Sequence, residues 1–313
     1  MTTAAAPTAI PDPDGVLLGM YPGGYLKTRA VELVQVEDWM APTGKRLSIA
    51  ATFIDLEDPD PIRAVPAEME AAWARGYTPF VNLSAGNLGT PWTAEQIADG
   101  ALDSEIRALA RAYARWSQGG EKQALIAPLQ EMNGYWTSYG EDPVHFKEAY
   151  RRIQQIFYEE GVVPLAVSWV FSPNGWSAEG QEFELYYPGD EVVDVVGFNS
   201  FNFGDCSAWP KWEAFEEIFL LYLERLHQMA PEKPIIVSSM GTVEQGGDKD
   251  QWLIDTYQQL VDYPQLRAVL YFNRWEVRES LGRCPDGTDY RVFVYPSGKG
   301  RPGFLEAVDL PEV

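Results

Sequence analysis

Short runs of apolar residues alternate along the chain with longer stretches in which apolar residues recur every three or four positions. Short apolar runs are typical of strands buried on both faces, and the periodic stretches are typical of amphipathic helices. The alternation predicts βα units around a parallel sheet. Eight strands are expected, over Val16–Tyr21, Leu47–Ile54, Thr78–Leu83, the apolar start of Ala124–Trp136, Pro164–Phe171, Val192–Phe198, Pro234–Ser238 and Arg267–Phe272.

The stretches between these runs predict helices that cover the sheet. One carries Val31, Leu33 and Val34 inward, another spans about Pro66–Arg75, and a third lies within Thr93–Trp116. The third has core positions at helical spacing and ends on Trp116, which we interpret as core; those positions are Ile97, Leu102, Ile106, Leu109, Ala110 and Tyr113. Because no linker or change of composition divides the chain, we predict a single α/β domain, a (β/α)8 TIM barrel over residues 15–313, after a flexible lead-in over residues 1–14.

The composition of the chain argues against nucleic acids and membranes as partners. The 313 residues include 46 acidic and 24 basic side chains, a formal net charge of −22 that would repel nucleic acids and anionic membranes. No run reaches the roughly 18 apolar residues of a membrane span, so we expect a soluble protein, and a monomer. The first residues lack the pattern of a signal peptide, so any export signal has been removed or was never present.

The two cysteines do not decide whether the protein works in an oxidising or a reducing compartment. The two cysteines, Cys206 and Cys284, each follow a predicted strand and could form one disulfide or remain as two thiols. No pairing of cysteines with histidines suggests zinc, and we expect neither a metal nor an organic cofactor.

The most informative stretch is ALIAPLQEMNGYW, from Ala124 to Trp136. Its apolar run ends at Glu131 and breaks into Asn133 and Gly134 before two aromatic residues. The carboxyl ends of barrel strands carry the chemistry, so a glutamate at this point is a candidate catalytic acid. A glutamate that merely ends a strand is the alternative.

Other predicted strand ends are also polar and aromatic. Asparagine offers both a hydrogen-bond donor and an acceptor, and tryptophan offers a flat apolar face, so together they fit a neutral polyhydroxyl ligand better than a phosphate. This pattern indicates sugar. The residues that we expect to bind it are Gln130, Asn133, Trp136, Trp169, Asn199, Phe201 and Trp275, with the three tryptophans along one groove.

Five motifs recur in order: PLQEMNGYW, SWVFSPNG, YYPGDEVVDVVGFNSFNFG, KPIIVSSMGTVEQGGDKDQW and RAVLYFN. In order and spacing they resemble glycoside hydrolase family 26, whose members include β-mannanases and some mixed-linkage β-glucanases. The resemblance implies a barrel that hydrolyses internal β-linkages of plant polysaccharides with retention, using two glutamates. It implies β-1,4-mannan as the first substrate to test and mixed-linkage β-1,3-1,4-glucan as the second.

Only one of the family's two catalytic glutamates has a counterpart in this sequence. Glu131 matches the acid/base of the family, but the nucleophile position at the end of the seventh strand falls on Ser239. Retaining glycosidases need a second carboxylate about 5–5.5 Å from the first, and a serine supplies none. Gln130 stands where the family usually has histidine, Phe201 where it usually has tyrosine, and Asn199 where it often has aspartate.

Ser239 cannot attack an anomeric carbon without a partner base, and neither His145 nor His227 is placed to serve as one. Glu244 and Glu276 lie in loops long enough to fold back, so either could in principle reach the nucleophile position. We interpret Glu244 as a loop residue that pairs with Lys249 or caps a helix, and Glu276 as a rim residue.

Two explanations remain for the serine: a deliberately inactivated form of an active enzyme, or a natural non-catalytic sugar-binding relative. We favour the first because Glu131, the tryptophans and the GGDK loop are intact. An unrelated barrel enzyme such as an aldolase ranks last, because the strand ends lack a lysine that could form a Schiff base.

Overall fold

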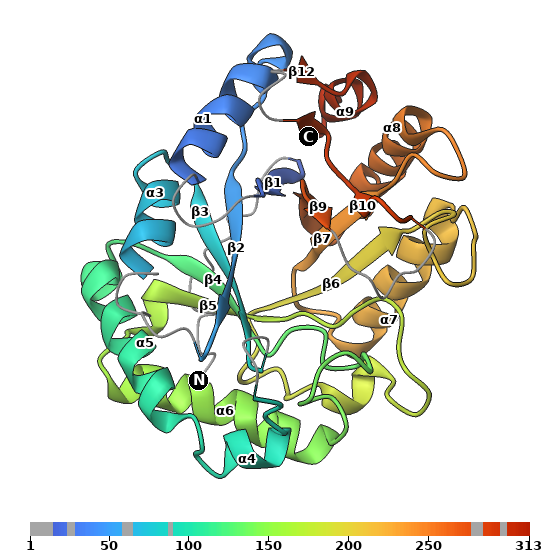
Figure 1. Cartoon of the computed structure of the whole chain (residues 1–313). Helices are drawn as coiled ribbons and strands as arrows, with labels where there is room; N and C mark the ends of the chain where they lie inside the picture. The colour runs from blue at the N-terminus through green and yellow to red at the C-terminus, as the bar shows by residue number, and fades with distance from the viewer. Residues whose placement is uncertain (1–14, 24–28, 58–64, 87–89, 277–283, 295–298) are drawn as a thin grey trace. The chain divides into compact units, whose positions relative to one another are not determined.

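The computed structural model describes residues 15–23, 29–57, 65–86, 90–276, 284–294 and 299–313 (Figure 1). Eight parallel strands follow one another in sequence order and close into a barrel. They are β1 (Leu17–Tyr21), β2 (Ile49–Asp55), β3 (Thr78–Ser84), β4 (Ala124–Pro128), β5 (Val167–Phe171), β6 (Val195–Asn202), β7 (Ile235–Thr242) and β8 (Leu266–Phe272). The predicted (β/α)8 fold is confirmed, and the predicted lead-in over residues 1–14 lies outside the described residues.

The chain forms two compact units. The first is Ala51–Phe198, and the second combines Pro13–Ala50 with Asn199–Val313. Helices of the first unit are α3 (Glu70–Trp73), α4 (Ala94–Ala98), α5 (Asp103–Ser117) and α6 (Pro143–Glu159), with short helical turns at Val65–Met69, Gln118–Gly120, Pro164–Ala166 and Phe183–Tyr186. Helices of the second are α1 (Arg29–Met40), α7 (Leu221–Met229), α8 (Lys249–Val261) and α9 (Pro302–Val308), with short turns at Ala41–Thr43 and Glu216–Leu220.

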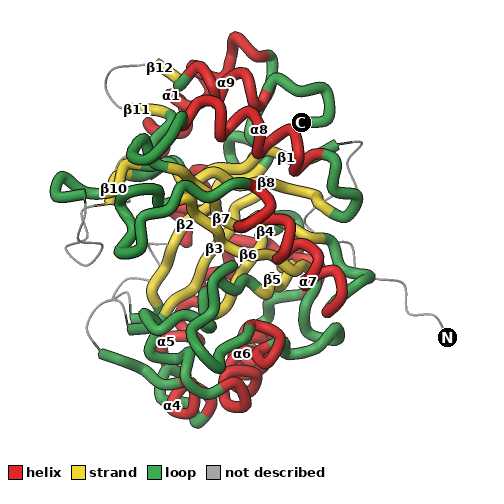
Figure 2. The backbone as a smooth tube through the Cα atoms, turned by 90° about the vertical axis from the view of Figure 1, so that its right-hand side faces the viewer, coloured by secondary structure: helices red, strands yellow, loops and turns green. Residues whose placement is uncertain are grey.

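In the first unit, the predicted helical face is confirmed. Every core position expected within Thr93–Trp116 is buried, including Trp116 at 5% exposure. The single predicted helix is wrong in one respect, because Gly100 adopts a φ of +97° between α4 and α5. Such a backbone conformation suits glycine and ends an α-helix. Helices α4 and α6 pack against each other beside α5 (Figure 2).

Strand boundaries differ most where polar residues are buried. Strands β6 and β7 run four residues beyond their predicted ends, because buried side chains such as Asn199, Asn202 and Ser239 look like loop residues in the sequence. The predicted start of the fifth strand at Pro164 is a 3₁₀ turn, and the predicted helix over Pro66–Arg75 is a π-helical turn followed by one turn of α3.

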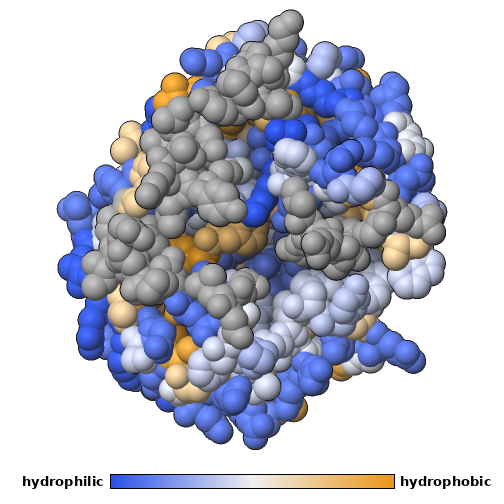
Figure 3. Space-filling view, in the orientation of Figure 1, coloured by the Kyte–Doolittle hydropathy of each residue, from blue (hydrophilic) through white to orange (hydrophobic). Residues whose placement is uncertain are grey.

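In the second unit, α1 buries Leu33, Val36 and Met40, whereas Val34 is 36% exposed. The prediction that Val34 faces inward is wrong, because the buried residues follow a spacing of three and four that passes it by. The side chain of Val31 lies outside the described residues. No described helix is long and apolar enough to cross a bilayer. Hydrophilic residues prevail over the described part of the face in Figure 3, in keeping with the charge of −22.

Candidate active site

The backbone turns sharply after β4. Leu129 and Glu131 both adopt left-handed conformations, with φ of +52° and +58°, which are uncommon for residues other than glycine. Leu129 is fully buried, and the amide of Glu131 donates a 2.9 Å hydrogen bond to the carbonyl of Ser172, just after β5. These contacts hold the strained turn in place, as is common where a side chain must be aimed for function.

Both carboxylate oxygens of Glu131 accept a hydrogen bond. Asn174 Nδ2 donates to Oε1 at 2.9 Å, and the indole Nε1 of Trp136 donates to Oε2 at 2.9 Å. Two donors in different directions fix the orientation of the half-buried carboxylate. The predicted catalytic acid is therefore an oriented group.

Asn133 acts as a buried brace beneath this pair. Its side-chain amide donates to the carbonyls of Asn174 and Trp176 and to Oγ of Ser177, at 2.8, 3.1 and 2.9 Å. Its oxygen accepts from the amide of Asn174 at 2.8 Å. Asn133 is 0% exposed, and a direct role for it in binding sugar stays a prediction. It positions Asn174, which in turn orients Glu131.

Gln130 is half-buried, and its carbonyl accepts a 2.8 Å hydrogen bond from the hydroxyl of Tyr139. Burial raises the pKa of Tyr139 well above its usual range, and the charges of Glu131 and Asp55 raise it further. Tyr139 therefore stays a neutral donor that fixes the turn. A role for the Gln130 side chain in binding stays a prediction.

Three exposed aromatic residues gather next to Glu131. Tyr135, Trp136 and Trp176 are 76%, 41% and 50% exposed. The two indoles stack with centroids 5.8 Å apart, and Tyr135 meets each edge-on. Because Trp136 also contacts the carboxylate, this aromatic surface is continuous with the candidate acid.

Trp169 does not belong to this surface. It is 2% exposed, packs edge-on against Phe157 and Tyr158 of α6, and donates from Nε1 to the hydroxyl of Tyr158 at 2.8 Å. The prediction of a sugar-stacking role is wrong for Trp169, because its side chain fills the layer between β5 and α6.

In the second unit, Ser239 lies at an irregularity of β7. Val237 pairs with Val269 and Met240 with Tyr271, so Ser238 and Ser239 together oppose one residue of β8. Such β-bulges re-aim side chains and recur next to active sites. Ser239 is 5% exposed and Ser238 is 1% exposed.

A cluster of aromatic rings surrounds Gly241, two residues after Ser239. A Cβ on Gly241 would lie 3.0 Å from Tyr290 and 3.2 Å from Phe201, so only glycine fits without displacing the rings. Phe201 packs against Tyr290 and Phe272 with centroids 5.2 and 5.6 Å apart. A tyrosine therefore does lie beside Phe201, although no pattern in the sequence pointed to it. Asn199 on β6 is 2% exposed, and a binding role for it and for Phe201 stays a prediction.

Trp275 and the two carboxylates considered as substitutes for the nucleophile, Glu244 and Glu276, belong to the second unit. Trp275 is 48% exposed and stands on the hairpin of β9 (Trp275–Glu276) and β10 (Thr288–Asp289). Another hairpin, of β11 (Phe293–Val294) and β12 (Lys299–Gly300), follows. Glu244 pairs with Arg301 instead of the expected Lys249, and Glu276 lies 3.9 Å from Arg274.

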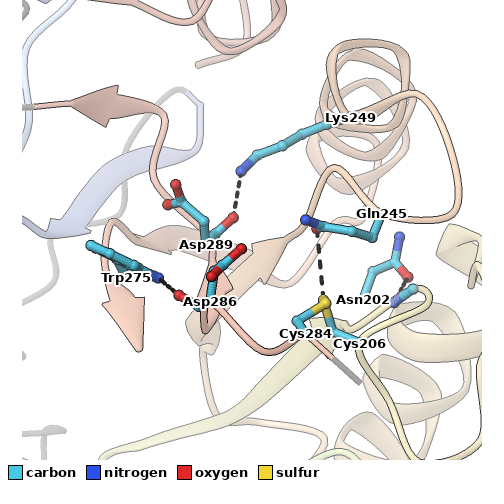
Figure 4. The surroundings of a disulfide bond; sticks show 9 residues. Asn202, Cys206, Gln245, Lys249, Trp275, Cys284, Asp286 and Asp289 are labelled. Carbon is cyan, nitrogen blue, oxygen red and sulfur yellow. Dashed lines mark hydrogen bonds between the residues drawn. A yellow bond between two sulfur atoms is a disulfide. The ribbon is translucent and has the colours of Figure 1, made fainter. Parts of the chain in front are cut away.

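Cys206 and Cys284 form a disulfide, which decides the alternative left open by the sequence (Figure 4). The bond joins the loop after β6 to the segment after β8, 78 residues apart. Cross-links over such a span stabilise a fold by roughly 4 kcal/mol if the entropy of the unfolded chain dominates.

No cluster of three or more potential metal-binding side chains occurs in the described part of the chain.

Known proteins that are similar in sequence include two curated relatives. Endoglucanase H of Acetivibrio thermocellus is 24% identical over 282 residues, covering 84% of this chain and 29% of that protein. Mannan endo-1,4-beta-mannosidase of Bifidobacterium adolescentis is 29% identical over 120 residues, covering 35% of this chain and 12% of that protein. The chain thus spans less than a third of either relative.

A solved structure shares the fold. The catalytic domain of the GH26 endo-beta-1,4-mannanase of Bacillus sp. JAMB-750 superposes with a TM-score of 0.65 at 15% identity, covering 95% of this chain and 86% of that one. Residues 94–265, which include Glu131 and Ser239, match the description of glycosyl hydrolase family 26. The resemblance seen in the motifs is therefore confirmed, and the chain belongs to glycosyl hydrolase family 26.

Proposed function

We propose that this chain carries the site of a retaining endo-β-glycanase in which Glu131 is the acid/base and Ser239 occupies the nucleophile position. The observation that carries the proposal is the carboxylate of Glu131, held on both oxygens by Asn174 and Trp136 at the end of β4. β-1,4-mannan is the first substrate and mixed-linkage β-glucan the second. The name of one relative, a mannan endo-1,4-beta-mannosidase, supports mannan, and that of the other, an endoglucanase, supports a glucan.

Glu131 would act twice in such a reaction. In the first step its proton passes to the leaving glycosidic oxygen while a carboxylate at position 239 attacks the anomeric carbon and forms a glycosyl ester. In the second step Glu131 takes a proton from water, and the water oxygen displaces the ester with a second inversion. Two inversions retain the configuration.

Ser239 cannot complete the first step. A neutral hydroxyl is a poor nucleophile without a base to accept its proton, and no histidine was predicted to serve it. We therefore propose that the chain, with serine at position 239, binds β-linked glycans and hydrolyses them negligibly.

Restoring the carboxylate tests the proposal. We expect Ser239→Glu to release oligosaccharides from mannan or mixed-linkage glucan with retention, and Glu131→Gln in the same background to abolish that release. Ser239→Gln is a matched control, because glutamine has the size of glutamate but no carboxylate that could attack the anomeric carbon, and this variant should stay inert. A folded, glycan-binding Ser239→Glu form that is inert on both polysaccharides would identify the chain as a non-catalytic binding relative.

A further inference from the structure

Trp275 is held at its edge. On the β9–β10 hairpin its Cα pairs with that of Asp289, and its indole Nε1 donates a 2.8 Å hydrogen bond to the carbonyl of Asp286 (Figure 4). Gly287 has a φ of +97°, and a Cβ there would lie 2.6 Å from Nε1. The glycine therefore permits the turn to close onto the indole.

Trp275 is also held at one face. The guanidinium of Arg291 lies 5.3 Å from the ring centroid, a distance at which cation and aromatic face attract each other. Asp289 fixes that guanidinium through two hydrogen bonds of 2.8 Å, from Nε to Oδ1 and from Nη2 to Oδ2. Paired bonds of this kind orient arginine more strictly than a single contact can.

Electrostatics agree with the geometry of this pair. Burial acts to raise the pKa of Asp289, but the hydrogen bonds and charge of Arg291 outweigh it and leave the pKa below its usual value. The hydrogen bonds that Arg291 donates to Asp289 also raise the pKa of Arg291. Both side chains are therefore charged across the neutral range.

The segment that carries Asp289 and Arg291 rests on buried donors. Lys249, which is 1% exposed, donates to the carbonyls of Asp289 and Arg291 at 3.1 and 3.2 Å. The hydroxyl of Tyr271 donates to the carbonyl of Tyr290 between them at 2.7 Å. Three successive backbone carbonyls thus accept hydrogen bonds from buried side chains, so the core of the unit sets the position of Arg291.

Despite these contacts, Trp275 remains 48% exposed. An aromatic ring that is fixed at its edge, backed by a cation and open to solvent has lost its motion before any ligand arrives. Such preorganisation lowers the entropy cost of binding. The apolar C–H face of a hexopyranose ring is a suitable ligand for the open surface.

We infer that Arg291, pinned by Asp289, is a positioning residue that fixes Trp275 as a stacking platform for one hexose ring of a bound β-linked glycan. This inference rests on the proposed function for the identity of the ligand. Arg291 itself acts through the indole and does not touch the sugar.

The test compares Trp275→Ala, Arg291→Met and Arg291→Lys with the parent chain by calorimetric titration of mannohexaose and cellohexaose. We expect affinity to fall by about tenfold or more for Trp275→Ala and by roughly fivefold for Arg291→Met. The affinity of Arg291→Lys, which keeps a cation, should lie between those of Arg291→Met and the parent chain. Arg274→Met is the matched control, since it removes a positive charge from the residue next to Trp275 without removing the cation over the ring, and should bind as the parent does.

A second readout does not depend on glycan. In ¹⁵N-tryptophan spectra, Arg291→Met should shift the indole N–H signal of Trp275 and speed its exchange with solvent, and Arg274→Met should not. Unchanged affinity and an unchanged signal in Arg291→Met would each overturn the role of Arg291. If the parent binds neither oligosaccharide, the stacking role fails together with the proposed binding. If binding persists but Ser239→Glu is inert, only the proposed catalytic function fails.

Discussion

The indole Nε1 of Trp136 donates a 2.9 Å hydrogen bond to Oε2 of Glu131, so one side chain joins the exposed aromatic surface to the candidate acid. A residue that stacks on a sugar ring and also orients the proton donor would couple binding to chemistry. The two contributions can be separated because the ring and its N–H can be removed independently.

Replacing Trp136 by phenylalanine should keep an apolar face and remove the donor. In a Ser239→Glu background we expect kcat to fall on the order of tenfold, because the carboxylate loses the orienting hydrogen bond from Trp136, while KM changes less. Trp136→Ala should in addition weaken oligosaccharide binding with little change in Tm, since the side chain is 41% exposed. A large fall in Tm with unaltered binding would show that Trp136 is a packing residue.

Asn133 should matter more for stability than for binding. Asn133→Ala leaves the amide of Asn174 without its partner and removes three donated bonds, so we expect a loss of about 2–4 kcal/mol in urea unfolding. Asn174→Ala, at a half-buried position, is the comparison: it should cost less than about 1 kcal/mol yet lower kcat in the Ser239→Glu background. Equal losses of unfolding free energy in Asn133→Ala and Asn174→Ala would contradict the structural role assigned to Asn133.

Lys249 predicts an unusual dependence of stability on pH. Burial lowers its pKa from 10.5 to about 8, although the charges of Asp289, Glu244 and Asp250 oppose the shift and that of Arg301 adds to it. Between those two values the unfolded chain holds a proton that the folded chain has released, so the free energy of unfolding rises with pH. Below pH 8 both states are protonated and the burial cost is fully present.

Lys249→Met lacks this titration and provides the reference. From pH 8 to 9.5 we expect the parent to gain about 2 kcal/mol relative to the variant in urea unfolding, and the buried tyrosines titrate alike in both. Parallel stability curves would mean that Lys249 keeps its ordinary pKa in the fold.

Local patterns sufficed to predict the barrel, and they made Glu131 a candidate because an apolar run that ends in a carboxylate is visible in the sequence. They did not reveal which face of a strand a residue occupies when both faces are buried. Trp169 was for this reason misassigned to the ligand side. Tyr290 and Arg291 escaped notice altogether, because they follow an irregular segment well beyond β8 and owe their positions to distant donors such as Lys249.

The disulfide shows a similar limit. Two cysteines in loops are compatible with either a disulfide or two thiols, and only the fold brings Cys206 and Cys284 to a Cα separation of 5.1 Å. The serine at position 239 could be recognised only through the resemblance, since nothing in its own stretch distinguishes it from a buried strand residue.

The final prediction concerns what the present chain can synthesise. An α-glycosyl fluoride has the anomeric configuration of the glycosyl ester that a nucleophile would form, and it carries its own leaving group. Ser239 leaves more room below the sugar than a glutamate would. The hydroxyl of an acceptor sugar can then attack the anomeric carbon while Glu131 takes its proton, the C–F bond breaks, and fluoride leaves. We expect the parent chain to couple α-mannobiosyl or α-cellobiosyl fluoride to an oligosaccharide acceptor with a new β-linkage.

The product should survive, because the β-linked oligosaccharide lacks an activated leaving group and the chain lacks a nucleophile to cleave it. Fluoride release and chain elongation, followed by an electrode and by mass spectrometry, should appear together and should vanish in Glu131→Gln, which cannot accept the proton. Ser239→Glu should instead hydrolyse what the parent makes. Binding of acceptor without any coupling from either fluoride would show that position 239 does not face the anomeric carbon, which would remove the basis for the assigned roles of Glu131 and Ser239.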